Sequence, residues 1–131
     1  MKQYLFIAIF VISFLMYGCS SEAKKEKIED LDFTVVEENE IPEELKTVIE
    51  EKKEAKFHMS YSNKDKLYII VGYGEQATGG YSIEVPTLYR TEASIVIDTN
   101  LIGPTGEALA KKSYPYIVIM TQYRDLPVEF Q

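Results

Sequence analysis

Residues 72–85 constrain the fold most, because they place four of the chain's seven glycines between two stretches with the pattern of β-strands. Residues 67–71 are apolar at every position, which is typical of a strand covered on both faces. Tyr81, Ile83 and Val85 alternate with polar residues, which is typical of a half-buried strand. A minimal hairpin turn needs only two conformationally permissive residues, and this segment has more. The segment therefore predicts two strands joined by a connection whose backbone has an unusual shape.

The rest of the chain beyond residue 32 also has mainly the pattern of short strands, and about six or seven are predicted in all. Residues 62–65 predict a hairpin turn, because their side chains readily bond their own backbone. Pro86 is expected to end a ladder or to mark a sheet edge, because proline has no N–H to donate. The further strands are predicted over residues 32–37, 57–61, 93–99, 114–120 and 126–130.

One helix is predicted near residues 42–55. Pro42 suits a first helical position, and the two glutamates after it complement the helix dipole. Leu45, Val48 and Ile49 form a narrow apolar stripe, so the helix should cover an edge or face of a sheet. Many short strands with a single helix predict a mainly β (β-rich α+β) fold, a small antiparallel β-sandwich or barrel-like domain.

The first 18 residues predict a signal peptide. The apolar run over residues 4–17 is shorter than the roughly 20 residues of a transmembrane helix. Cys19, the only cysteine, directly follows Gly18 at the end of this run. Residues 15–19 resemble a bacterial lipoprotein signal, and the alternative is an uncleaved signal anchor. The resemblance implies that Cys19 carries lipid, such as palmitate. The lipid would hold the protein on the extracytoplasmic face of the cell membrane, or on an outer membrane if the source has one.

The mature chain is expected to contain a tether and one domain. Residues 19–31 are polar and charged, so they should form a disordered tether. Residues 32–131 are long enough for a single β-domain with the helix near 42–55. With one cysteine, no disulfide can form within the chain, so the core alone must hold the fold.

The negative charge is concentrated in the predicted tether and the predicted helix. The chain has a net charge of -7, and residues 22–54 contain thirteen acids and six bases. Residues 55–131 contain eight acids and seven bases, so this part is close to neutral. Because no basic stripe exists, nucleic acid is not an expected partner.

The residues that could carry chemistry are few. The glycine-rich segment lacks the Lys-Ser/Thr of a phosphate-binding loop, and a strand pattern follows it where a dinucleotide-binding motif needs a helix. His58, the sole histidine, is expected to be an ordinary surface residue. Glu75, Asp98 and Glu107 have no spacing that brings them together. The sequence therefore predicts no enzyme, cofactor, metal site or small-molecule substrate.

Residues 68–85 resemble the signature of the PrcB C-terminal domain family, in which Gly-Glu-x-x-Thr-Gly-Gly-Tyr is followed by an alternating strand. Two further segments, residues 113–119 and 126–129, are similar to the family's aromatic-Pro-Tyr strand and closing Leu-Pro-Val segment. Ala77 departs from the pattern, where proline is more usual. The founding members are lipoproteins that associate with and stabilise a secreted subtilisin-like protease. The resemblance implies a non-enzymatic, membrane-anchored protein that binds an exported partner, with a secreted protease expected.

The glycine-rich segment is the candidate partner-binding site. An alternative comes from chagasin-type inhibitors of cysteine proteases, whose Thr-Thr-Gly-Tyr loop resembles residues 78–81. Residues 103–106 could mimic a second inhibitor loop, but a third has no counterpart here. A generic surface binding domain is the remaining alternative. The residues predicted to bind a partner are Gly74, Glu75, Gln76, Ala77, Thr78, Gly79, Gly80 and Tyr81.

Overall fold

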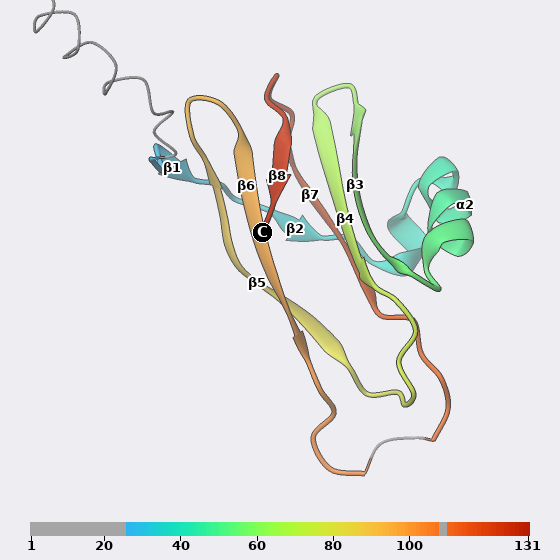
Figure 1. Ribbon diagram of the computed structural model, residues 1–131. Coiled ribbons are helices and arrows are strands. Elements are labelled where there is room, and N and C mark those ends of the chain that lie inside the picture. Colours follow the sequence, from blue (N-terminus) through green and yellow to red (C-terminus); the bar gives the residue numbers. More distant parts are fainter. Residues whose placement is uncertain (1–25, 108–109) are drawn as a thin grey trace, which may run out of the picture.

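The computed structural model describes residues 26–107 and 110–131, which form a β-sandwich with one α-helix on its outside (Figure 1). The predicted lipid site, Cys19, lies outside these residues. The first sheet has the order β1-β5-β6-β8 and the second has the order β2-β7-β4-β3. The predicted mainly β fold is confirmed, and the two sheets do not close into a barrel. The first sheet contains β1 (Glu29–Asp30), β5 (Ser82–Arg90), β6 (Ile95–Ile102) and β8 (Val128–Phe130); the second contains β2 (Thr34–Val35), β3 (Lys56–Asn63), β4 (Lys66–Tyr73) and β7 (Tyr116–Gln122).

One pairing departs from the antiparallel sheet that the sequence predicts. All neighbouring strands are antiparallel except β6 and β8, which run parallel. The reason is that residues 123–127 carry the chain from the end of β7 in the second sheet to the first sheet. The chain thus enters β8 in the direction of β6. A sequence pattern does not encode this choice of sheet.

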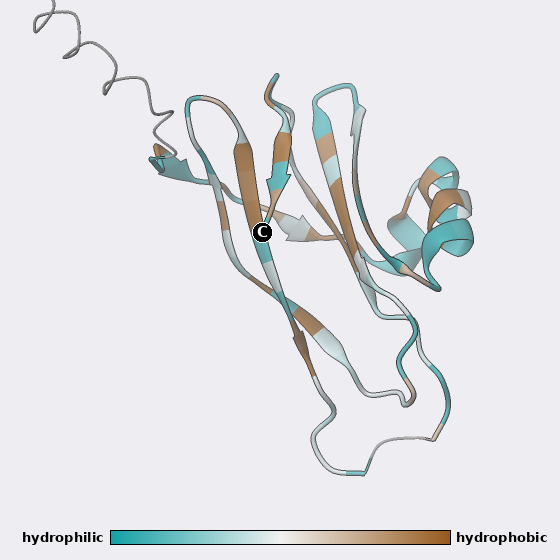
Figure 2. Ribbon diagram, in the orientation of Figure 1, coloured by the Kyte–Doolittle hydropathy of each residue, from teal (hydrophilic) through white to brown (hydrophobic). Residues whose placement is uncertain are grey.

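The space between the sheets is filled by branched aliphatic side chains from both. Leu67 and Ile69 of β4 meet Ile95 and Ile97 of β6, all of them buried. Figure 2 shows hydrophobic residues in the facing strands. Because alternate residues of a strand point to opposite faces, Tyr68 and Ile70 point away from this core. β4 is therefore covered on both sides, as its unbroken apolar run predicts.

A second apolar cluster lies on the outer face of the second sheet, under helix α2 (Glu43–Lys52). Leu45 and Ile49 of the helix are buried there against Tyr68, Ile70 and Val118 of the sheet. The half-buried side chains of β3 that pack on this cluster are Phe57, Met59 and Tyr61. Their predicted role as an apolar face is confirmed, with the helix as its cover.

Both ends of α2 differ slightly from the prediction. Pro42 precedes the helix in an extended conformation, with φ -55° and ψ 143°. Its carbonyl accepts hydrogen bonds from the N–H groups of Leu45 and Lys46, each 3.0 Å long. The helix ends at Lys52, before the predicted residue 55. A short 3₁₀ turn, η2 (Glu38–Glu40), comes before it.

The predicted tether over residues 19–31 is too long at its C-terminal end. Residues Glu29 and Asp30 form β1 and pair with Arg90 and Tyr89 of β5. Leu31 is only 6% exposed and belongs to the core between the sheets. A count of apolar side chains missed β1 because its own two residues, Glu29 and Asp30, are exposed and are held by backbone pairing.

Pro86 does not end the ladder, but it lies in the part of β5 that β1 leaves uncovered, so it marks a sheet edge as predicted. Strand β5 continues to Arg90, and its register against β6 shifts between Glu84 and Thr87. Proline is tolerated at such a bulge, because the extra residue does not have to donate to the neighbouring strand.

Candidate protein-recognition site

The glycine-rich segment crosses from one sheet to the other. It leaves β4 at Tyr73 in the second sheet and enters β5 at Ser82 in the first. It is therefore not a hairpin, and this explains why it has more permissive residues than a tight turn needs. The connection from β6 to β7, residues 103–115, makes the reverse crossing at the same end of the sandwich (Figure 1). We call these two segments together the crossing end.

Ser113 holds the two crossing segments together. The N–H of Gln76 donates to the carbonyl of Ser113 over 2.8 Å, and the N–H of Ser113 donates back over 3.0 Å. The Ser113 hydroxyl donates to the carbonyl of Thr78 over 2.6 Å. These bonds hold the backbone of the turn at Gln76 and at Thr78, so the turn has a defined conformation.

Two glycines allow the turn to follow this path. Gly74 has φ +77° and lies against the backbone of Lys56, where an added Cβ would stand 3.1 Å from the Lys56 nitrogen. Gly80 has φ +87°, and an added Cβ would stand 2.9 Å from the Cβ of Pro104. L-residues rarely adopt such angles. Both the backbone angle and the close packing therefore disfavour a side chain at position 80. Because glycine has none, the two crossing segments can come into contact here.

Glu75 is an exposed acid with two partners from the second crossing segment. Its carboxylate lies 3.4 Å from the Lys112 ammonium and accepts a 3.4 Å hydrogen bond from the Tyr114 hydroxyl. The Lys53 ammonium, at the end of α2, stands 5.4 Å from the centre of the Tyr114 ring. These exposed contacts are individually weak, but they give the rim of the crossing end an organised set of charges.

Two groups near the crossing end have shifted pKa values. A hydrogen bond with Glu50 raises the pKa of Lys53 above its ordinary value of 10.5. Desolvation by burial raises the pKa of Tyr116 above its ordinary value of 10.0, and the negative charges of Glu38 and Glu50 add to the effect. Both groups keep their neutral-pH forms, so neither provides a proton-transfer group near neutral pH.

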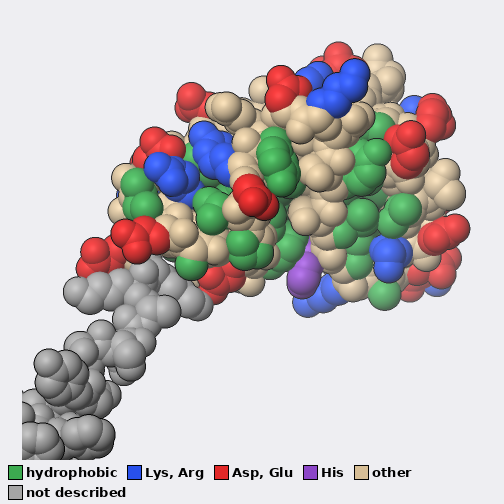
Figure 3. Space-filling model, turned by 90° about the horizontal axis from the view of Figure 1, so that it is seen from above, with side chains coloured by type: hydrophobic (Ala, Val, Ile, Leu, Met, Phe, Trp, Pro, Cys, Tyr) green, Lys and Arg blue, Asp and Glu red, His purple; other side chains and the backbone are tan. Residues whose placement is uncertain are grey.

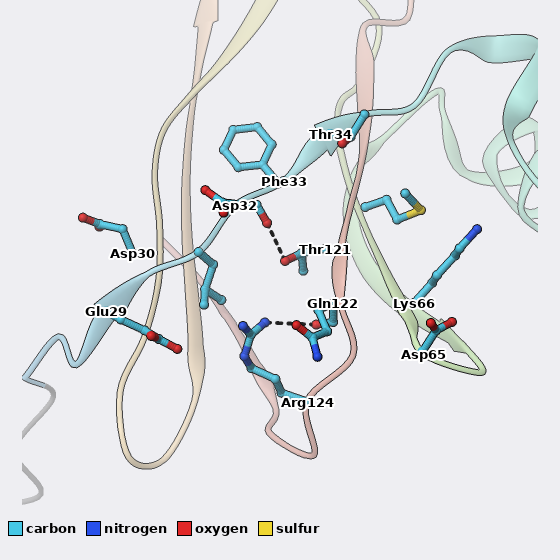
Figure 4. A pocket seen from close by; sticks show the side chains of 12 residues that line it. Glu29, Asp30, Asp32, Phe33, Thr34, Asp65, Lys66, Thr121, Gln122 and Arg124 are labelled. Carbon is cyan, nitrogen blue, oxygen red and sulfur yellow. Dashed lines mark hydrogen bonds between the residues drawn. The ribbon is translucent and has the colours of Figure 1, made fainter.

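A hollow lies at the opposite end of the sandwich. It has a volume of about 480 Å³ and lies beneath the segment that joins β1 to β2 (Figure 4). The Thr121 hydroxyl donates to the Asp32 carbonyl over 2.7 Å, and Arg124 donates to the Gln122 carbonyl. Acidic and basic side chains are interspersed over this end (Figure 3). No group of three metal-binding side chains gathers anywhere in the described residues.

The family comparison covers the strands that build the crossing end. Residues 67–122 match the family model described as PrcB C-terminal. This match confirms the predicted resemblance to the PrcB C-terminal family over residues 67–122. The match runs from Leu67, the second residue of β4, to the end of β7, so it includes both crossing segments. No curated protein and no solved structure shows significant similarity to the chain.

The structure exposes only part of the predicted partner-binding segment. Glu75, Ala77 and Gly80 are exposed, while Gly74 is buried. The remaining residues of the segment are half-buried: Gln76, Thr78, Gly79 and Tyr81. The side chain of Gln76 donates to the Tyr73 carbonyl over 3.2 Å, so this residue shapes the turn. The accessible surface is therefore smaller than the sequence predicts.

Sequence reasoning missed the residues of the second crossing segment that support the turn. Ser113, Pro104 and Tyr114 contact the turn but lie more than 20 residues away along the chain. The Gly-Pro pair at 103–104 and the Ser-Tyr-Pro segment at 113–115 signalled special backbone shapes. Their local sequence pattern does not indicate that they contact the turn.

His58 does not point simply to solvent, although it is exposed. Its ring stacks on that of Phe130, with centroids 4.0 Å apart. This contact joins the outer strands of the two sheets, β3 and β8. A histidine stacked on phenylalanine at a strand edge provides packing.

Proposed function

We propose that this protein is an exported lipoprotein whose PrcB C-terminal domain binds and stabilises a secreted subtilisin-like protease. The observation that carries the proposal is the family match over residues 67–122, which spans the crossing end. The binding is non-enzymatic, and the expected contact surface is formed by Glu75, Ala77 and Gly80 with residues 103–106. A lipid on Cys19 would hold the protein on the extracytoplasmic side of the membrane.

The position of the crossing end supports this arrangement. The tether would enter the domain at β1, which lies at the other end of the sandwich from the glycine-rich turn (Figure 1). A lipid anchor on that side would leave the crossing end facing away from the membrane. Within the described ranges, no helix is long and apolar enough to span a membrane.

The binding proposal is tested by measuring how long an exported subtilisin-like protease stays active with and without this protein. Ala77→Arg should abolish protection, because Ala77 is exposed at the centre of the proposed surface. Thr47→Arg, on the exposed side of α2, is the matched control and should protect normally. Equal protection by both variants would show that the crossing end is not the binding surface. If the unaltered protein gives no protection, a subtilisin-like protease is not its partner.

The lipid anchor is tested separately with labelled palmitate. The unaltered protein should incorporate label and remain with the membrane, because each buried CH₂ group of an acyl chain contributes about 0.8 kcal/mol. Cys19→Ser should take up no label and be released. Equal labelling of the two proteins would contradict lipidation at Cys19.

Inhibition of a papain-like cysteine protease is the second candidate. The observation in its favour is the close approach of Gly80 to Pro104, which puts residues 78–81 beside residues 103–106. Two neighbouring loops are what a chagasin-type inhibitor would need on this side. Inhibition of papain by the purified protein, lost in Ala77→Arg, would support this candidate over the subtilisin-like partner.

A further inference from the structure

The outer edge of β3 is the longest regular strand edge left uncovered in the described part of the chain. The other terminal strands of the two sheets are β1, β2 and β8, which have two or three residues each, whereas β3 has eight. Its register with β4 is continuous, with no shift. The part of β5 that extends beyond β1 is interrupted by Pro86 and a bulge. Long, regular edges are uncommon because they offer a template to another strand.

The hydrogen-bond pattern shows which backbone groups β3 offers. The N–H of Tyr73 bonds to Pro115 on the β7 side, so the odd-numbered residues of β4 face β7 and the even-numbered ones face β3. In β3, the partners of those even-numbered residues are the odd-numbered ones. The backbone N–H and C=O groups of His58, Ser60 and Ser62 therefore point away from the sheet. None of them has a backbone partner among the described residues.

A mostly apolar cavity opens beside the same edge. It has a volume of about 350 Å³ and lies between β3 and the short strand β8. Its apolar walls include Val71, Ile97 and Phe130, and the Phe130 ring carries the stacked His58. This volume is near the lower limit for ligand pockets, so it suits one or two apolar side chains. In strand-addition complexes, backbone bonds provide affinity and such pockets select side chains.

The charge of this edge indicates which kind of segment would fit. Residues 56–66 contain three lysines and one aspartate, which gives +2 in a chain whose net charge is -7. A second copy would bring the same lysines to this edge, so charge favours a different partner with acidic residues.

We propose that β3 is a strand-addition site for an extended segment of a partner protein. In this segment an apolar side chain, flanked by acidic residues, enters the cavity beside Phe130. The inference rests on the proposed function only in taking the segment from an exported protein. The site is the edge of β3, which does not contain the residues changed to test the crossing end. The two proposals can therefore fail separately.

The probe is a library of random displayed dodecapeptides, selected on the purified protein, because the natural segment is not identified. The selected peptides should share one apolar position between acidic ones. On binding, the amides of His58, Ser60 and Ser62 should become protected from hydrogen exchange, while those of Phe57, Met59 and Tyr61 are protected already. Protection that appears elsewhere and leaves these three amides unchanged would overturn the proposal.

Ser60→Pro and Ser60→Ala form a matched pair, because both remove the hydroxyl but only proline removes the outward N–H. Proline should weaken peptide binding on the order of tenfold, and alanine should bind like the unaltered protein. Hydrogen exchange in the unaltered protein provides an answer even if the proline variant does not fold. Equal binding by two folded variants contradicts strand addition. If the protein dimerises and the three amides are protected without peptide, the edge of β3 pairs with a second copy of the chain, which contradicts a partner segment.

Discussion

The two ends of the sandwich connect the same two sheets by different means. At the crossing end, the chain passes between the sheets twice, and the two segments are tied by Ser113 and by the contact of Gly80 with Pro104. At the opposite end, the segment from β1 to β2 crosses between the sheets. Each of these strands has only two residues, and the one buried side chain of the segment is Leu31. The crossing end depends on backbone shape, and the N-terminal end depends on apolar burial. Substitutions can separate these two kinds of stabilisation.

Leu31→Ala should have the largest effect, a loss of about 2 to 5 kcal/mol in the free energy of unfolding, because it leaves a cavity in the core. The measurement is chemical denaturation, with Ile28→Ala as control. Ile28 is 48% exposed, so its substitution should change stability by less than about 0.5 kcal/mol. Equal, small effects at both positions would show that Leu31 belongs to the tether and not to the core. The N-terminal end would then not depend on apolar burial.

Gly80→Ala should lower the free energy of unfolding by about 2 kcal/mol, because it combines a positive φ with a close approach to Pro104. Gly106→Ala isolates the backbone term: Gly106 has φ +88°, but an added Cβ would meet nothing within 4 Å. This control should cost about 1 kcal/mol. If the two variants lose the same stability in denaturation, contact between the crossing segments contributes nothing.

Ser113→Ala should cost about 1 kcal/mol, the usual contribution of one hydrogen bond, because the Thr78 carbonyl loses its donor. Ser82→Ala, at an exposed position in β5, should be neutral by the same measurement. The amide of Gln76 should also exchange faster in the first variant. Unchanged exchange and stability would show that the backbone bridge alone holds the turn.

Alkaline pH should produce the smallest effect, through Tyr116 beside the crossing end. Its pKa is raised in the folded protein by desolvation, so folding favours the neutral phenol. The corresponding stabilisation is complete below pH 10, the ordinary pKa, and is lost as pH rises through the folded-state pKa. Melting temperatures measured from pH 8 to pH 11 should fall less steeply for Tyr116→Phe than for the unaltered protein. Parallel curves would contradict the shift.

The contrast between the two ends also marks how far the candidate site could be predicted. The glycines at 74 and 80 are visible in the sequence because positive φ has a compositional signature. Ser113 has no such signature: its hydroxyl bonds a carbonyl 35 residues away. The half-buried state of Gln76 and Thr78 follows from that contact. Prediction therefore found the turn and overestimated its accessible surface.

By itself, the sequence determined the mainly β class, the helix and the doubly covered β4. These depend on periodicity and local propensity, which operate over a few residues. Tertiary structure alone decided that the glycine-rich segment joins different sheets and that β8 lies parallel to β6. It also decided that Glu29 and Asp30 form a strand, because backbone groups pair regardless of side-chain character. Such pairings depend on which distant strand is adjacent in space, and local sequence does not contain that information.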